Sequence, residues 1–308
     1  MRGTTSGVIT VGTWEERDTT MGPVLAALDR LRQFDHRGAV RASFLTLLAV
    51  GGEGVEVDEV FDIVHRLGPF QPSRVIVVRV LPGEDHRLDA RVGVHLQSRG
   101  SQCVGIDDVA VEVVGPVTAH LDSLVEPLTL PELPVVVWCR ERLPPARSRL
   151  IELADYLVVD TVAAGGRSKL PAVARLHQRT PVIDFAWLRL LPLRRRLAAR
   201  FRRPDLRPLL DSVDSVVVTG PEVERALLAG WLLDRLPGVA INEKEGNPAL
   251  LSVVVESRGR HLRVETADET VTTECLLAEA LLHMSPDPVF SAALVGACRN
   301  DVAETRTS

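Results

Sequence analysis

The chain has 308 residues, of which 45% are hydrophobic and 25% are charged, and its formal net charge is −5. This length suits two domains of ordinary size, each with a full hydrophobic core. The acidic balance disfavours nucleic acid as the main partner, because binding to phosphates favours a basic protein face.

The first half of the chain predicts one α/β domain over residues 21–164, after a polar and loosely held segment over residues 1–20. Apolar residues at helical spacing predict helices over 21–33, 57–67 and 116–124. Runs rich in Val, Ile and Leu predict strands over 41–50, 74–81, 89–96, 109–114, 134–138 and 156–160.

The second half predicts another α/β domain over residues 165–299, followed by a polar, frayed tail over residues 300–308. The predicted helices are 171–178, 192–201, 221–236 and, as the last one, 272–284. The predicted strands are 181–184, 214–219 and a hairpin of 250–256 with 261–265. Because strands alternate with helices, we expect two mixed α/β domains whose central sheets are largely parallel or mixed.

A glycine-rich turn, Gly51-Gly-Glu-Gly54, follows one predicted strand and precedes a helix. This is the place where a dinucleotide-binding turn would lie. Val57 stands where the third glycine of that motif belongs, and the residues before it delay the start of the helix. An ordinary loop is therefore the favoured interpretation.

Two further loops at strand ends are candidates for binding an anion such as a sugar phosphate. One contains Arg167, Ser168 and Lys169, where backbone N–H groups and a helix dipole would attract negative charge. It lacks the spacing of a P-loop, and a flexible joint between domains is the plainer alternative. The other contains Thr219 and Gly220. There, Thr219 and a Glu three residues later also have the form of a helix capping box.

Arginines gather along the predicted helix 192–201 and just beyond it. Leu193, Leu197 and Phe201 form an apolar stripe, so the basic residues occupy the opposite face. The pattern is typical either of a solvated helix face or of a docking surface for an acidic partner. The candidates for contact are Arg194, Arg195, Arg196, Arg200 and Arg203.

Motifs with specific catalytic or metal-binding spacing are absent from the sequence. The four cysteines form no CxxC pair, the eight histidines form no HxxxH or HExxH pattern, and no GxSxG turn is present. We therefore expect no catalytic residue, no metal and no cofactor. The N-terminus lacks the features of a signal peptide, and no apolar run is long enough for a membrane span, so a cytoplasmic location is expected.

Four short sequence motifs occur in a characteristic order at residues 71–78, 130–138, 155–160 and 184–189. Each consists of a turn joined to a hydrophobic segment. With the helix segment around Trp231, they resemble the OpcA family of glucose-6-phosphate dehydrogenase assembly proteins, from about residue 39 to about residue 293. Gln71 stands where the family usually has His, and Ala186 stands where it usually has Asn. Ser73, Arg74, Asp184 and Trp187 match the family.

This resemblance implies a non-enzymatic regulatory subunit that binds glucose-6-phosphate dehydrogenase and favours its active state, in the oxidative pentose phosphate pathway. The matching residues Ser73, Arg74, Asp184 and Trp187 would then contact the partner or a ligand, together with the arginine-rich helix. Arg74 begins a strand, so a buried structural ion pair is an equal possibility. The alternative function is a sugar-phosphate-binding or glycosyltransferase-like enzyme that uses the loops around Arg167 and Thr219.

Overall fold

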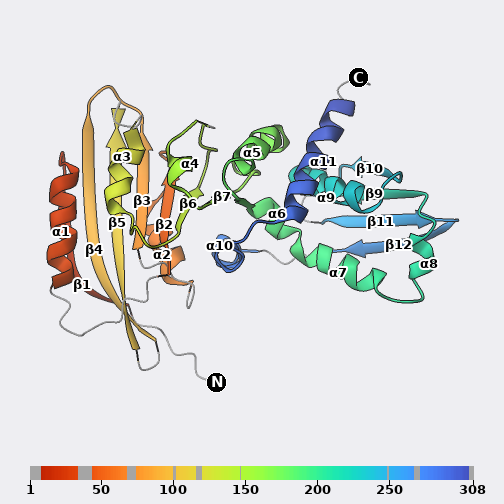
Figure 1. The fold of residues 1–308 in the computed structure, drawn as a ribbon, viewed down its shortest axis with the longest axis horizontal. Helices are drawn as coiled ribbons and strands as arrows, with labels where there is room; N and C mark the ends of the chain where they lie inside the picture. The colour runs from red at the N-terminus through yellow and green to blue at the C-terminus, as the bar shows by residue number, and fades with distance from the viewer. Residues whose placement is uncertain are drawn as a thin grey trace. The chain divides into compact units, whose positions relative to one another are not determined.

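The computed structural model describes residues 8–33, 44–67, 74–99, 102–115, 120–145, 147–247, 250–266 and 271–304. By its internal contacts the chain divides into two compact units, Met1–Val158 and Val159–Ser308. Helices and strands are mixed in both units (Figure 1). The predicted α/β class with mixed sheets is therefore confirmed.

The first sheet has eight strands in the order β1-β4-β5-β3-β2-β6-β7-β8. β5, β3, β2, β6 and β7 pair in parallel, whereas β4 is antiparallel to both of its neighbours. From the central β2, the chain moves to one side for β3 and to the other for β6. The strands are β1 (Val8–Glu16), β2 (Thr46–Gly51), β3 (Arg74–Leu81), β4 (Arg87–Arg99), β5 (Gln102–Val114), β6 (Val135–Cys139), β7 (Tyr156–Val159) and β8 (Val182–Asp184).

The central strands of this sheet have continuous apolar stretches, as is usual for parallel strands whose faces are covered by helices. Val75, Ile76 and Val77 of β3 are completely buried, as are Val136 and Val137 of β6. Of the covering helices, α1 packs against β4 and α2 against β3. The helical segments of this unit are α1 (Met21–Gln33), α2 (Val57–His65), α3 (Leu121–Val125), η3 (Glu126–Leu128) and α4 (Leu150–Leu153).

The N-terminal strand β1 corrects one prediction. Residues 1–20 were expected to be loosely held, but Val8–Glu16 pairs with β4 in antiparallel register, with Trp14 opposite Val92. β1 lies at the edge of the sheet, and most of its described side chains are exposed or half-buried. Backbone hydrogen bonds rather than a hydrophobic pattern hold it, so the polar composition concealed the strand.

The second unit is built on a four-stranded sheet with the order β10-β9-β11-β12, in which only the β9–β10 pair is parallel. Its strands are β9 (Ser215–Thr219), β10 (Ala240–Lys244), β11 (Ser252–Ser257) and β12 (Arg260–Glu265). Its helical segments are η4 (Arg167–Lys169), α5 (Leu170–His177), α6 (Phe185–Arg189), α7 (Leu191–Phe201), α8 (Arg207–Leu210), α9 (Glu222–Arg235), α10 (Thr273–Leu282) and α11 (Pro288–Glu304).

Helices α9 and α11 approach each other at two glycines. A Cβ atom added to Gly230 would lie 2.1 Å from the carbonyl oxygen of Ala293, and one added to Gly296 would lie 2.6 Å from the carbonyl oxygen of Gly230. Contacts this close are possible only without side chains, so these glycines allow the two backbones to touch.

Besides the short helical segments η4, α6 and α8, the strand β10 and the helix α11 of the second unit were not predicted. The strand β10 lies at the sheet edge and most of its residues are exposed, so its sequence has no hydrophobic pattern that would predict a strand. The helix α11 was missed because two of its buried residues, Ala293 and Ala297, are small. Since α11 continues through Glu304, the expectation of a tail that frays from residue 300 is wrong for residues 300–304. Residues 305–308 lie outside the described residues.

Candidate functional site

The carboxylate of Asp184 occupies the centre of a buried polar cluster in the second unit. It accepts hydrogen bonds from the backbone N–H of Ala186 (2.9 Å), the backbone N–H of Thr161 (3.2 Å) and the hydroxyl of Thr161. Burial raises the pKa of Asp184 to about 6, although these hydrogen bonds oppose the shift. Asp184 is fully buried and caps the N-terminus of α6, so its visible role is to position that helix.

Beside this cluster, Arg189 joins two acidic residues. Its guanidinium lies 2.5 Å and 3.0 Å from the two carboxylate oxygens of Asp160, and 3.4 Å from Oε1 of Glu224. Burial raises the pKa of Glu224. Oε2 of Glu224 is buried and has no hydrogen-bond partner among the described residues. The arrangement balances charge inside the unit, and it exposes no pair of carboxylates to a substrate.

Trp187 is also internal. Its indole Nε1 donates a hydrogen bond to Asp287 Oδ2 (2.8 Å), and the guanidinium of Arg194 lies 3.6 Å from the centroid of its ring. Burial lowers the pKa of Arg194 to about 10. Phe290 also packs against Trp187, with ring centroids 5.6 Å apart. Trp187 and Arg194 therefore connect α6 and α7 to the start of α11 and leave little surface for a partner.

In the loop containing Arg167, Ser168 and Lys169, the guanidinium of Arg167 and several backbone N–H groups already have partners within the protein. Arg167 forms two hydrogen bonds to the carboxylate of Glu243, at 2.7 Å and 3.3 Å, and Arg225 also donates to that carboxylate. The backbone N–H groups of Gly166 and Lys169 donate to carbonyl oxygens of the same loop. The predicted anion site thus already contains an anion of the chain itself. Glu243 lies on β10, the strand that the sequence did not reveal.

Thr219 and Gly220 form neither a capping box nor an open loop. Thr219 is the last residue of β9 and pairs with Lys244 and Ser252 in the sheet. The helix α9 begins at Glu222 with Pro221 at its N-cap, and no side chain caps it. The capping box predicted from Thr219 is therefore wrong, because the sheet holds this residue in the strand.

Arginines of α7, of the residues just after it and of β12 form a basic surface, which we call the arginine hollow. It is a depression of about 660 Å³ between α7 and β12, and its cationic lining residues are Arg196, Arg200, Arg203 and Arg263. Arg203 pairs with Asp205 at 2.8 Å, and Arg196 donates to the carbonyl oxygen of Glu265 at 2.8 Å. Arg200 has no ion pair or hydrogen bond among the described residues.

Arg195 lies next to the arginine hollow on the same helix. Its side chain is 68% exposed, and its nearest carboxylate, on Glu279, is 3.8 Å away. Such an exposed and distant pair contributes little to stability. Arg195 and Arg200 are therefore available for contacts with an acidic partner.

Arg74 lies in the first unit and is buried. Its guanidinium donates to the carbonyl oxygen of Leu128 and lies 3.4 Å from the carboxylate of Asp107, which also accepts from Arg32 of α1. This geometry favours the structural ion pair over a contact role. Ser73 lies outside the described residues.

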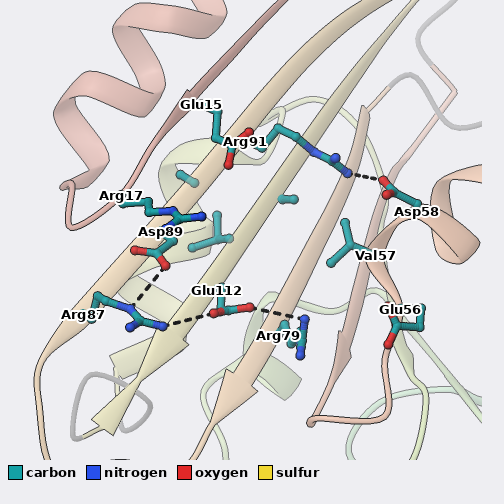
Figure 2. A pocket seen from close by; sticks show the side chains of 13 residues that line it. Glu15, Arg17, Glu56, Val57, Asp58, Arg79, Arg87, Asp89, Arg91 and Glu112 are labelled. Atoms are coloured by element: carbon teal, nitrogen blue, oxygen red, sulfur yellow. Dashed lines mark hydrogen bonds and ion pairs between the residues drawn. The ribbon is translucent and has the colours of Figure 1, made fainter.

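Figure 2 shows a charged groove of about 520 Å³ on the first unit, whose side chains come from several neighbouring strands and from the start of α2. Three of the arginines that line it, Arg79, Arg87 and Arg91, point toward acidic neighbours. Arg87 lies 3.2 Å from Asp89 and 3.3 Å from Glu112, Arg79 lies 3.3 Å from Glu112, and a further pair joins α2 to β4. Because these charges are compensated within the groove, it offers no strong attraction for either sign.

Among the described residues, no group of three His, Cys, Asp or Glu side chains is placed to hold a metal ion. Cys139 is buried, and burial raises its pKa to about 12, so the thiol stays protonated. None of the described helices is both long and apolar enough to cross a membrane.

Comparison with protein families gives two adjacent matches. Residues 65–178 match the family described as the N-terminal domain of a glucose-6-phosphate dehydrogenase subunit, and residues 180–294 match the family described as its C-terminal domain. The chain belongs to the OpcA family. The resemblance to this family that the sequence motifs indicated is thereby confirmed. The descriptions of both matched domains name a dehydrogenase subunit rather than a catalytic chain.

Two other comparisons add little to the OpcA assignment. Among solved structures, the chain is similar to a putative myo-inositol dehydrogenase from Sinorhizobium meliloti 1021, with a TM-score of 0.38 and 10% identity over 85% of this chain and 98% of that one. A likeness this low carries no argument about activity. Comparison with curated proteins gives no match.

Proposed function

We propose that this protein is a non-enzymatic, cytoplasmic assembly factor that binds glucose-6-phosphate dehydrogenase and activates it allosterically. The family match supplies the partner, since both matched domains are described as parts of a glucose-6-phosphate dehydrogenase subunit. Activation requires that the protein bind the active state of the dehydrogenase more tightly than the inactive state.

The observation that supports docking is the arginine hollow with the adjacent Arg195. Arginine is favoured at protein interfaces, because its planar guanidinium binds carboxylates through two hydrogen bonds. Exposed arginines also speed association with an acidic partner surface. Of the predicted contact residues, Arg195, Arg196, Arg200 and Arg203 remain candidates, whereas Asp184, Trp187 and Arg194 are used inside the unit.

The alternative function, a sugar-phosphate-binding or glycosyltransferase-like enzyme, was suggested by two loops, and the contacts of these loops do not support it. The guanidinium of Arg167 is already bound to Glu243, and Thr219 belongs to the sheet. A phosphate would have to displace a buried carboxylate from two arginines. We therefore propose no catalytic role for these loops.

The test is a titration of purified dehydrogenase from the same source with this protein, followed by enzyme kinetics and size-exclusion chromatography. We expect a saturable change in rate or Michaelis constant, and co-elution of the two proteins. The double variant Arg195→Glu with Arg200→Glu should weaken the apparent affinity by about tenfold or more, because two attractive contacts become repulsive.

A matched control reverses two exposed arginines elsewhere in the second unit, Arg175 of α5 and Arg235 of α9. The variant Arg175→Glu with Arg235→Glu has the same net charge as the test variant and should activate normally. Equal loss in both variants would indicate a general charge effect and would remove the arginine hollow from the proposal. An absence of any complex, in reduced and in oxidised buffer, would refute the proposed function.

A further inference from the structure

A second cavity lies at the centre of the first sheet, in the position where open α/β sheets bind ligands. It has a volume of about 760 Å³ and is lined by Val50 and Gly51 at the end of β2, Val80 at the end of β3 and Cys139 at the end of β6. β3 and β6 lie on opposite sides of β2, so the strand order reverses here. Ligands of such sheets bind outside the carboxyl ends of the strands at this reversal.

The walls of this switch-point cavity combine apolar residues with cations. Val50, Val80, Leu121 and Leu143 offer an apolar surface, while two of the arginines that line the cavity are Arg142 and Arg147. Neither of these arginines has an ion pair or hydrogen bond among the described residues. The volume falls within the usual range for small-molecule sites, which are mostly apolar with a few polar groups that fix orientation.

The side chain of Glu141 fills the glycine-rich turn at residues 51–54, which follows β2. The carboxylate of Glu141 accepts a hydrogen bond from the backbone N–H of Gly52 at 3.0 Å. A Cβ atom added to Gly54 would lie only 2.1 Å from Oε1 of Glu141, so this carboxylate fills the space beside the glycine. In dinucleotide-binding proteins the pyrophosphate takes this place. Glu141 therefore excludes a pyrophosphate from the turn.

We propose that the switch-point cavity binds a purine mononucleotide. The flat heteroaromatic base suits the apolar walls, and polar lining residues such as Asp122 and Ser148 can accept or donate hydrogen bonds to the ribose hydroxyls. The single phosphate suits Arg142 and Arg147, which line the same cavity and have no acidic partner among the described residues. A dinucleotide is disfavoured because Glu141 occupies the place of its pyrophosphate. This site does not depend on the proposed interaction with the dehydrogenase.

The experiment is isothermal titration calorimetry of the full chain with AMP, adenosine and NADP⁺, without the dehydrogenase. AMP should bind with a micromolar Kd, and adenosine and NADP⁺ should each bind at least about tenfold more weakly. Arg142→Glu with Arg147→Glu should weaken AMP binding by about tenfold or more. The control Arg175→Glu with Arg235→Glu should bind AMP as the wild type does.

A further variant tests the closed turn. Glu141→Ala should bind NADP⁺ about tenfold more tightly than the wild type, because the turn is then open to a pyrophosphate. Circular dichroism of each variant establishes that the fold is retained. Absence of AMP binding to the wild type, equal loss in the Arg142/Arg147 and control variants, or tighter binding of NADP⁺ than of AMP to the wild type would each overturn the proposal.

Discussion

Replacing Asp184 distinguishes its structural role from a contact role. In Asp184→Ala, the backbone N–H groups of Thr161 and Ala186 lose their acceptor while both residues stay buried. Each buried group left without a partner costs about 1–3 kcal/mol, so we expect a loss of about 3 kcal/mol in the free energy of unfolding. In Asp184→Asn, the amide oxygen can accept both N–H bonds, and the amide NH₂ can donate to the hydroxyl of Thr161. This variant should lie within about 1 kcal/mol of the wild type at pH 4, where the carboxyl of Asp184 is protonated.

The charge of Asp184 adds a pH dependence with a defined sign. Its pKa rises from an ordinary value of 3.8 to about 6 in the folded protein. The stability that this group contributes is fully present below pH 3.8 and is lost as the pH rises through about 6. A shift of about two pKa units corresponds to about 3 kcal/mol. Relative to Asp184→Asn, the wild type should therefore lose up to about that much stability between pH 4 and pH 7.

Urea unfolding of the wild type and both variants, at several pH values across that window, measures these differences. The structural interpretation is refuted if Asp184→Ala unfolds at the same urea concentration as the wild type. It is also refuted if Asp184→Asn is destabilised as strongly as Asp184→Ala. If either variant keeps its stability but loses activation of the dehydrogenase, Asp184 is a contact residue after all.

Three further substitutions test other parts of the fold. Gly230→Val should destabilise the protein by about 3 kcal/mol in thermal unfolding, because a side chain there meets the backbone of α11; an unchanged Tm would contradict the close approach. Trp187→Phe removes the hydrogen bond to Asp287 and leaves a cavity where part of the buried indole was, which together should cost about 2 kcal/mol or more in urea unfolding. Asp108→Asn should lower the pKa of His65 in an NMR titration. Burial lowers that pKa, but the hydrogen bond and charge interaction with the Asp108 carboxylate raise it overall; an unchanged pKa would show that the pair is not formed.

The parts of the fold that the sequence predicted are those whose residues carry a hydrophobic pattern. The strand β3 was predicted with its observed bounds because Val75–Val78 is an unbroken buried run. The strands β1 and β10 were missed because they lie at sheet edges and are held by backbone hydrogen bonds. Propensity and periodicity contain no information about such pairing.

The candidate site was harder to predict, because chemistry at a buried residue depends on its neighbours in space. Asp184 and Trp187 were identified as important residues, but their partners Thr161 and Asp287 are distant in the sequence. In the same way, a carboxylate from the loop after β6 fills the glycine turn after β2, and no local pattern connects Glu141 to that turn. The basic face of α7 was predictable because its apolar and its charged residues lie on a single helix, where helical spacing in the sequence determines which residues share a face.

The central position of β2 has a practical consequence for anyone who divides this chain into fragments. The family match begins at residue 65, but β2 precedes it and hydrogen-bonds to both β3 and β6. A fragment trimmed to the matched residues would lack its middle strand and would expose two apolar strand edges, which favours aggregation. The region by which relatives are recognised is thus shorter than the region that must fold together, and expression of the first unit should begin before Val8.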